Sequence, residues 1–272
     1  MNRLGIEQIS VFGLPPVEYV NLVADLGCAN MSAALYSFGY NPHHYPAWSL
    51  KDDANLRREM IAALRDRGVT ISLFEGLSVR EGLDVRDRAA ELDLAAELGA
   101  VRINTVSMDP DLGRTFDGFA IMTEMAAERG LTTTTEFAPG LTVADLPTAI
   151  AAMHHVGRED FRLLIDTMHF GRTGARIEDL AALDPDRIGY VQIADAPMTP
   201  RFETYFEEAM HERMVPGTGE MPIREILALV PKDRVVSAEV PLRSRAELGM
   251  GPYDRLLPAV EATRALLAEA DG

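Results

Sequence analysis

The stretch FRLLIDTMHF, residues 161–170, places four apolar side chains within five positions and follows them with Asp166 and His169. A short apolar run of this kind is typical of a β-strand that is buried on both faces. An ionised carboxylate at the end of such a strand is costly to bury unless a positive charge meets it. The stretch therefore predicts a buried strand whose terminal acid has a cationic partner.

Three other stretches repeat this pattern. LTTTTE ends at Glu136, IGYVQ ends at Gln192 with Asp195 just beyond it, and VVSAE ends at Glu239. If these strands lie side by side and parallel, their ends bring together three carboxylates, including that of Asp166, and one amide oxygen. The simplest partner for such a set is a divalent cation.

Strand-like and helix-like segments alternate along the whole chain. The predicted strands cover residues 6–12, 31–35, 69–74, 101–106, 131–137, 161–166, 188–192 and 235–240. The predicted helices cover residues 15–27, 52–67, 84–98, a segment ending at 130, 142–156, 177–183, a segment ending at 230, and 253–269. This alternation implies parallel strands, and eight units favour a single (β/α)8 TIM barrel over residues 1–272. The Gly-rich turn that usually marks an open, doubly wound sheet is missing after the first predicted strand.

The composition is that of an ordinary soluble protein, with 47% hydrophobic residues and a formal net charge of −16. Such acidity argues against nucleic-acid binding, because no basic stripe is available to neutralise phosphates. The single cysteine, Cys28, excludes an internal disulfide framework and fits a reducing compartment. Because residues 1–5 lack signal-peptide features and no window is apolar enough to span a membrane, we expect a cytoplasmic protein without membrane contact.

In a TIM barrel, ligands and catalysis lie at the C-terminal ends of the strands. Glu136, Asp166, Gln192 and Glu239 occupy that position on four consecutive predicted strands. Any one of them alone could be a helix N-cap or a solvated loop acid, but four equivalent positions favour a shared metal site. Oxygen ligands suit Mg²⁺ or Mn²⁺, whereas Zn²⁺ more often takes His or Cys, and only His169 is near.

These residues resemble the metal quartet of the sugar isomerase/epimerase superfamily of xylose-isomerase-like TIM barrels. The resemblance covers essentially the whole chain, and its most specific signals are the Asp-Thr-x-His motif at Asp166 and the segment RMVPGTGE, residues 213–220. It implies a divalent metal, Mn²⁺ or Mg²⁺ first and Zn²⁺ or Co²⁺ as alternatives. It also implies that His169 contacts substrate or a metal-bound oxygen and that Arg213 binds substrate oxygens. Gln192 stands where many relatives have His, which leaves the metal and the substrate open.

The expected chemistry is proton abstraction next to a metal-bound carbonyl, with Glu136 and Glu239 taking and returning protons. The first hypothesis is an isomerase or epimerase acting on a sugar or related keto-polyol. The second is a lyase on the same scaffold, either 3-dehydroshikimate dehydratase-like or keto-glycoside-eliminating, with a keto-acid or sugar-like substrate. The third is a non-catalytic barrel that binds a metal or ligand. An endonuclease IV-like site would need more His ligands and a different charge.

Further residues are weaker candidates. Glu75, at the end of the third predicted strand, is either a substrate contact or a structural acid. His43 lies in an aromatic loop that could cover a sugar face, pack against the barrel or form a homodimer contact; its other members are Tyr36, Phe38, Tyr40, His44, Tyr45 and Trp48. The segment 196–219 is long for a barrel loop, and such segments often act as lids.

Overall fold

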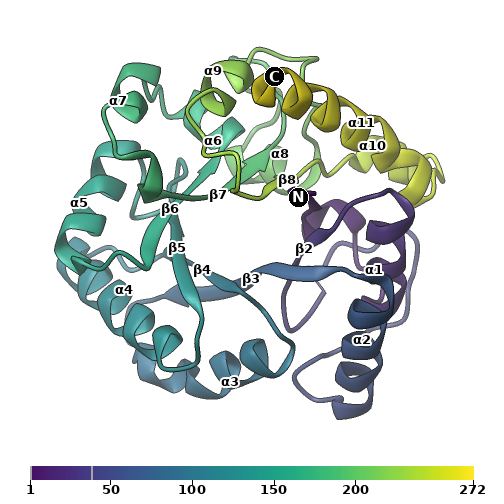
Figure 1. The fold of residues 1–272 in the computed structure, drawn as a ribbon, viewed down its shortest axis with the longest axis horizontal. Helices are drawn as coiled ribbons and strands as arrows, with labels where there is room; N and C mark the ends of the chain where they lie inside the picture. Colours follow the sequence, from purple (N-terminus) through teal and green to yellow (C-terminus); the bar gives the residue numbers. More distant parts are fainter. Residues whose placement is uncertain (1, 38) are drawn as a thin grey trace.

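The computed structural model describes residues 2–37 and 39–272, so Phe38 of the aromatic loop lies outside the described residues. The described chain forms a closed barrel of eight parallel strands in sequence order, with β8 pairing back onto β1 (Figure 1). This confirms the predicted single (β/α)8 architecture. The strands are β1 (Leu4–Ile6), β2 (Asn30–Ala33), β3 (Thr70–Val79), β4 (Arg102–Ser107), β5 (Thr132–Glu136), β6 (Phe161–Asp166), β7 (Ile188–Ile193) and β8 (Val236–Ala238).

Helices surround the barrel on the outside (Figure 1). The α-helices are α1 (Pro16–Asp25), α2 (Ala54–Arg67), α3 (Ala89–Glu97), α4 (Leu112–Ala127), α5 (Leu146–Val156), α6 (Thr167–Arg172), α7 (Ile177–Ala181), α8 (Tyr205–His211), α9 (Ile223–Leu227), α10 (Arg243–Glu247) and α11 (Pro252–Asp271). The 3₁₀ helices are η1 (Gln8–Val11), η2 (Val85–Arg88) and η3 (Pro185–Arg187). The sequence sets their ends locally: Asp53 caps the first backbone N–H groups of α2, and Gly68 ends that helix in the left-handed conformation.

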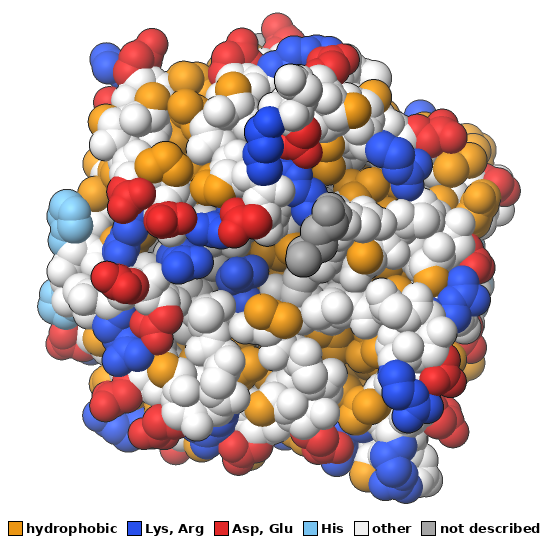
Figure 2. Space-filling view, in the orientation of Figure 1, with side chains coloured by type: hydrophobic (Ala, Val, Ile, Leu, Met, Phe, Trp, Pro, Cys, Tyr) orange, Lys and Arg blue, Asp and Glu red, His pale blue; other side chains and the backbone are white. Residues whose placement is uncertain are grey.

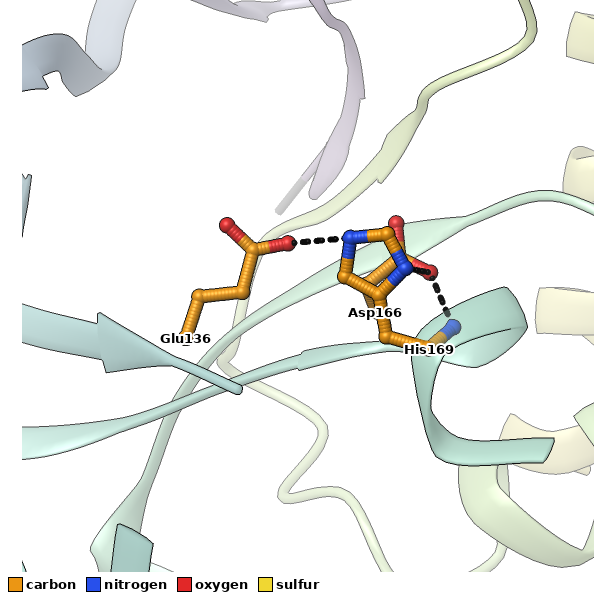
Figure 3. A group of neighbouring side chains, drawn as sticks. All are labelled: Glu136, Asp166 and His169. Carbon is orange, nitrogen blue, oxygen red and sulfur yellow. Dashed lines mark hydrogen bonds and ion pairs between the residues drawn. The ribbon is translucent and has the colours of Figure 1, made fainter. Parts of the chain in front are cut away.

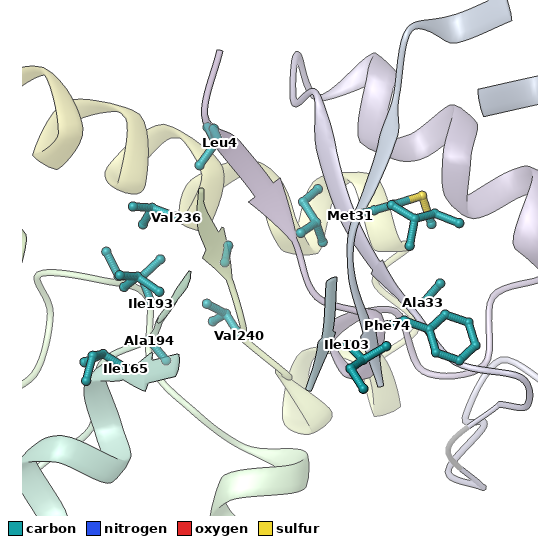
Figure 4. Packing of buried hydrophobic residues seen from close by; sticks show 14 of the residues in the cluster. Leu4, Met31, Ala33, Phe74, Ile103, Ile165, Ile193, Ala194, Val236 and Val240 are labelled. Atoms are coloured by element: carbon teal, nitrogen blue, oxygen red, sulfur yellow. The ribbon is translucent and has the colours of Figure 1, made fainter. Parts of the chain in front are cut away.

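The main core lies between the strands and the surrounding helices. Figure 4 shows part of it, with Leu4, Met31, Phe74, Ile165 and Val236 contributed by five different strands. Burial of these side chains holds the helices against the barrel. On the outer surface, acidic and basic side chains are mixed over the visible face (Figure 2). Among the described residues, the structure contains no helix with both the length and the apolar character needed to cross a membrane.

Two predicted strand boundaries are wrong. The first strand ends at Ile6 rather than Phe12, because the chain turns into η1 directly after Glu7. There the Ser10 hydroxyl accepts a hydrogen bond from the Val240 N–H, at 2.9 Å, in place of strand pairing. The third strand does not end at Glu75 but continues to Val79, with a shift of register after Phe74.

Two of the predicted helical and loop segments also differ from the structure. The helix expected over residues 84–98 is split into η2 and α3. The long segment 196–219 contains a helix of its own, α8, which Thr204 caps by accepting a hydrogen bond from the Glu207 N–H. This helix carries side chains to the C-terminal end of the barrel, where the candidate site lies.

Candidate active site

Strand geometry turns the predicted acids toward the barrel interior. Along β6, Leu163 belongs to the core under the helices, whereas Leu164 packs with Tyr190 in a separate small cluster. Side chains two positions apart on a strand share a face. Asp166 therefore lies on the face of Leu164, and Gln192 lies on the face of Tyr190. Both Asp166 and Gln192 are about 1% exposed.

Glu136, Asp166 and His169 form a tight group (Figure 3). One ligand atom from each lies within 4.8 Å of the others, close enough to hold a metal ion. His169 Nε2 is 3.0 Å from Glu136 Oε1, and its Nδ1 is 3.5 Å from Asp166 Oδ1. Asp166 is also the N-cap of α6 and accepts the His169 N–H at 2.8 Å. The spacing of the Asp-Thr-x-His motif thus follows from a capped helix turn.

Arg213 joins the acids of β6 and β8. Its Nη1 lies 2.5 Å from Asp166 Oδ2, and its Nη2 lies 2.8 Å from Glu239 Oε2. The guanidinium is also held by a 2.7 Å hydrogen bond from Nε to the Ala209 carbonyl in α8. Although burial alone would raise the pKa of Asp166, Arg213 and then His169 bring it below its usual range. Burial, with Asp166 and Glu136 nearby, raises the pKa of Glu239 despite the presence of Arg213.

Asp195, just beyond β7, positions the loop that carries Arg213. The backbone of Asp195 pairs with that of Met214 in both directions. Its carboxylate accepts hydrogen bonds from the N–H groups of Gly217 and Met221, at 2.9 and 3.0 Å. A Cβ on Gly219 would come within 2.3 Å of the same carboxylate. The RMVPGTGE segment therefore owes its glycine at 219 to a close approach rather than to contact with a ligand.

Gln192 donates hydrogen bonds through its side-chain amide to two further acids of the site. Its Nε2 donates to Glu7 Oε2 at 3.1 Å and to Glu75 Oε1 at 3.2 Å. Within residues 2–37 and 39–272, its buried Oε1 has no hydrogen-bond partner. The same holds for Glu239 Oε2, whose contact with Arg213 is an ion pair without hydrogen-bond geometry. Two buried oxygens at the predicted metal site thus retain lone pairs.

Two polar residues that the sequence reasoning missed complete the site. Glu7, directly after β1, is 1% exposed and accepts hydrogen bonds from Tyr190 and Gln192. Asn104 on β4 donates to Glu136 Oε2 at 3.1 Å and to Glu75 Oε2 at 3.4 Å. An acid directly after an apolar run was the available signal for Glu7, the same pattern that marked the later strands.

The site holds more negative than positive charge. Five acidic side chains surround it, whereas the described residues that line its cavity include one arginine and one histidine. Burial raises the pKa of Glu7, and burial followed by the charges of Glu136 and Glu7 raises that of Glu75. Raised values show that these carboxylates lack full cationic compensation. The acids are Glu7, Glu75, Glu136, Asp166 and Glu239.

A cavity of about 230 Å³ opens above these residues at the C-terminal ends of the strands. Of the predicted site residues, Glu75, Glu136, His169, Arg213 and Glu239 line it. Asp166 and Gln192 lie beside it through their contacts with these residues.

The structure does not bring His43 to this cavity. Its Nε2 instead lies 3.0 Å from Arg255 Nη1, and its ring packs near Tyr45. Trp48 of the same loop donates to the Gly13 carbonyl at 3.0 Å. For these two residues, the alternative that the loop packs against the barrel describes the structure better than contact with a sugar.

Fold and cavity together define a TIM barrel with a carboxylate-rich site at the strand ends, as barrel enzymes have. The family model described as xylose isomerase-like TIM barrel matches residues 20–266, and the chain belongs to this family. No curated protein matches the sequence.

Solved structures share the fold over nearly the whole chain. The IOLI protein with a bound zinc atom has a TM-score of 0.81 at 16% identity, covering 98% of both chains. The probable 3-DHS dehydratase AsbF of Bacillus anthracis has a TM-score of 0.74 at 13% identity, covering 97% of this chain and 99% of its own. An L-ribulose 3-epimerase has a TM-score of 0.72 at 15% identity, covering 100% and 96%. The neighbouring structures thus include an epimerase and a probable dehydratase.

The residues present fit a divalent cation. The excess of carboxylates calls for positive charge, and the lone pairs on Gln192 Oε1 and Glu239 Oε2 are available to a ligand. Carboxylate and amide oxygens are ligands for Mg²⁺ and Mn²⁺, and an adjacent imidazole also allows Zn²⁺.

Proposed function

We propose that this chain is a divalent-metal-dependent isomerase or epimerase acting on a sugar or related keto-polyol. The observation that carries the proposal is the convergence of Glu136 and Glu239 on one cavity, beside Asp166 and Arg213. Two carboxylates from different strands can address a substrate carbon from two sides. Membership in the xylose isomerase-like family supports an enzyme of this class.

Glu136, Asp166, Gln192 and Glu239 are the proposed metal ligands. His169 belongs to the close group with Glu136 and Asp166, and we propose it as a substrate contact. Nε2 pairs with Glu136, and Nδ1 contacts the Tyr205 hydroxyl. Gln192 Oε1, in contrast, has no partner within the part of the chain that the structure describes. Glu7 and Glu75 hold the amide nitrogen of Gln192 and so fix the direction of this oxygen.

The bound ion would stabilise the negative charge that develops on a substrate carbonyl oxygen. Glu136 is the proposed base, because Asn104 and His169 hold one of its oxygens each and so fix its direction. Glu239 is the proposed acid, since it lines the same cavity from just beyond β8 and can return the proton. Removal of a proton on one face of the substrate carbon and its return on the other face inverts that centre.

The remaining cavity residues position the substrate. Arg213 lines the cavity while it pairs with Asp166 and Glu239, so we propose that it orients both carboxylates and meets a substrate oxygen. His169 and Glu75 also line the cavity and are proposed to contact substrate hydroxyl groups. Small sugar-like molecules are therefore the proposed partners.

Deuterium exchange tests the proposal. The protein is loaded with Mn²⁺ and incubated in D₂O with ketoses, inosose-like cyclitols, 3-keto-glycosides and 3-dehydroshikimate. We expect deuterium uptake next to the carbonyl without loss of mass from the carbon skeleton. Exchange that persists in Glu136→Gln, or that is absent with every substrate, would contradict the proposed roles.

A lyase is the second candidate, and one contact favours it. The Tyr205 hydroxyl meets His169 Nδ1, and His169 lines the cavity. Burial raises the pKa of Tyr205, so the phenol keeps its proton and can donate a hydrogen bond to Nδ1, which leaves the Nε2–H of His169 able to donate a hydrogen bond to a leaving oxygen. In the exchange experiment, loss of water or of an alcohol from the substrate would identify this reaction.

A further inference from the structure

We propose that the substrate has two chemically different ends: a polyoxygenated head that meets the acids and an apolar ring or chain that lies nearer the mouth of the cavity. The inference of a polyoxygenated head depends on the proposed function, whereas the inference of an apolar end depends on a separate part of the cavity lining. We call that part the apolar wall. It consists of Ile9, Val106, Met108, Leu141, Phe206 and Met210.

Along strand β4, the cavity lining changes from polar to apolar toward the mouth of the cavity. Asn104, Val106 and Met108 all line the cavity, as expected for alternate residues of one strand and its extension. Asn104 contacts the acids, whereas Val106 and Met108 are apolar and lie farther toward the mouth. At about 3.3 Å per residue, the lining turns apolar about 7 Å beyond Asn104. That distance is comparable to the width of one sugar ring.

Phe206 faces the cavity from helix α8 and is held in place by its surroundings. Its ring lies against Gly140, where a Cβ would come within 2.8 Å of the ring. Gly140 also has a φ of +90°, which disfavours any larger residue. Tyr205 packs against the Phe206 ring in an edge-to-face arrangement. The ring is thus positioned at the cavity although 43% of its surface is exposed.

Exposure of this wall points to an apolar ligand. Met108 is 51% exposed and Phe206 43% exposed, and both border the same cavity. None of the six wall side chains, all of which the structure describes, carries a hydrogen-bond donor, and the thioethers of Met108 and Met210 are only weak acceptors. The outer hydroxyls of a free hexose would therefore lose hydrogen bonds to water without replacement. An aromatic or alkyl substituent on the head would instead gain from burial against the wall.

A matched pair of unreactive ligands tests this inference. Methyl and phenyl β-D-glucopyranoside carry the same head and differ only in the apolar group. Their dissociation constants for the Mn²⁺-loaded protein are measured by calorimetry or ligand-observed NMR. We expect the phenyl compound to bind about tenfold more tightly or better, from burial of one aromatic ring. Equal dissociation constants, or binding of neither compound, would overturn the proposal.

Variants of the apolar wall test which side chains cause the preference for the phenyl compound. Phe206→Ala and Met108→Ala should each reduce the phenyl preference severalfold and leave methyl glucoside binding unchanged. Phe202→Ala is the control, because Phe202 packs against Arg201 and Arg243 and is not a member of the wall. Circular dichroism and the Tm of each variant confirm folding. A phenyl preference that survives both wall variants would also contradict the proposal.

The two proposals can fail separately. Deuterium exchange without a phenyl preference would leave the isomerase or epimerase standing and remove the apolar wall from substrate recognition. A phenyl preference lost in Phe206→Ala, in a protein that exchanges no substrate proton, would support the apolar wall and contradict the proposed reaction.

Discussion

Two groups of acids lie around the cavity at the C-terminal side of the barrel, and their negative charges are compensated in different ways. Asp166 and Glu239 share the buried guanidinium of Arg213, and Glu136 pairs with His169. Glu7 and Glu75, in contrast, receive only neutral donors from the side chains that the structure describes. Acids on the same side of the barrel thus differ in their partners. We propose that the first group binds the metal ion and transfers protons, whereas the second group holds the Gln192 amide.

The largest expected effect is a difference in turnover between variants of the two groups of acids. Glu239→Gln removes the proposed acid and should lower turnover by about 10²- to 10⁴-fold in the substrate assay. Glu7→Gln keeps one of the two oxygens that accept from Tyr190 and Gln192 and removes no proposed catalytic group, so it should lower turnover far less. If both variants lose activity equally, the proposed division between the groups is wrong.

The next effect concerns stability. Arg213→Met leaves Asp166 and Glu239 buried without their cation, and removal of one partner from a buried ion pair typically costs about 3–5 kcal/mol. Urea unfolding of the metal-free protein measures this loss. Arg243→Met is the control, since Arg243 pairs with the more exposed Glu207 and should cost less than about 1 kcal/mol. Similar losses in both variants would contradict the account.

A smaller effect on the free energy of unfolding is expected from a change of pH. The pKa of Glu7 is raised by burial, so its protonated form favours the folded state. Its contribution to stability is present below the ordinary glutamate pKa of 4.5 and is lost as the pH rises through the raised pKa. Asp166, whose pKa is lowered, contributes stability above the ordinary aspartate pKa of 3.8 and loses that contribution as the pH falls further.

Urea unfolding of the metal-free protein between pH 5 and pH 8 tests this prediction. Glu7→Gln should remove a slope of up to about 1.4 kcal/mol per pH unit. An unchanged pH profile in this variant would show that Glu7 does not titrate in that range.

The smallest effect is expected at His43. Because its imidazole contacts Arg255 rather than the cavity, His43→Gln should leave turnover within about twofold of the wild type. His169→Gln provides the comparison, since this side chain lines the cavity. A large loss of turnover in His43→Gln would contradict this placement and would indicate that the aromatic loop contributes to the active site.

The barrel and the strand-end acids could be predicted because both depend on a simple period. Apolar runs define buried strands, and alternation along each strand fixes which side chains point inward. That rule placed Glu136, Asp166 and Gln192 correctly at strand ends, since their strands end where the apolar runs end. It missed Glu7, because the apolar pattern continues beyond Ile6 although the backbone turns there into η1.

Other features depend on contacts that no local pattern records. The pairing of Arg213 with two acids requires the loop after β7 to fold back on the barrel, which Asp195 directs through its hydrogen bonds. His43 lies in a loop without periodicity, so residue type alone suggested a role. Phe206 reached the cavity on a short helix within the segment that was expected to form a lid.

Titration with Mn²⁺, followed by electron paramagnetic resonance, tests the central claim most directly. The account predicts one tightly bound ion per chain, lost in Glu136→Gln and in Asp166→Asn and weakened in Gln192→Leu, which removes the unpartnered oxygen. His211→Gln, on the outer part of α8, should bind Mn²⁺ as the wild type does. No bound ion in the wild type, or undiminished binding in the Glu136 and Asp166 variants, would contradict it.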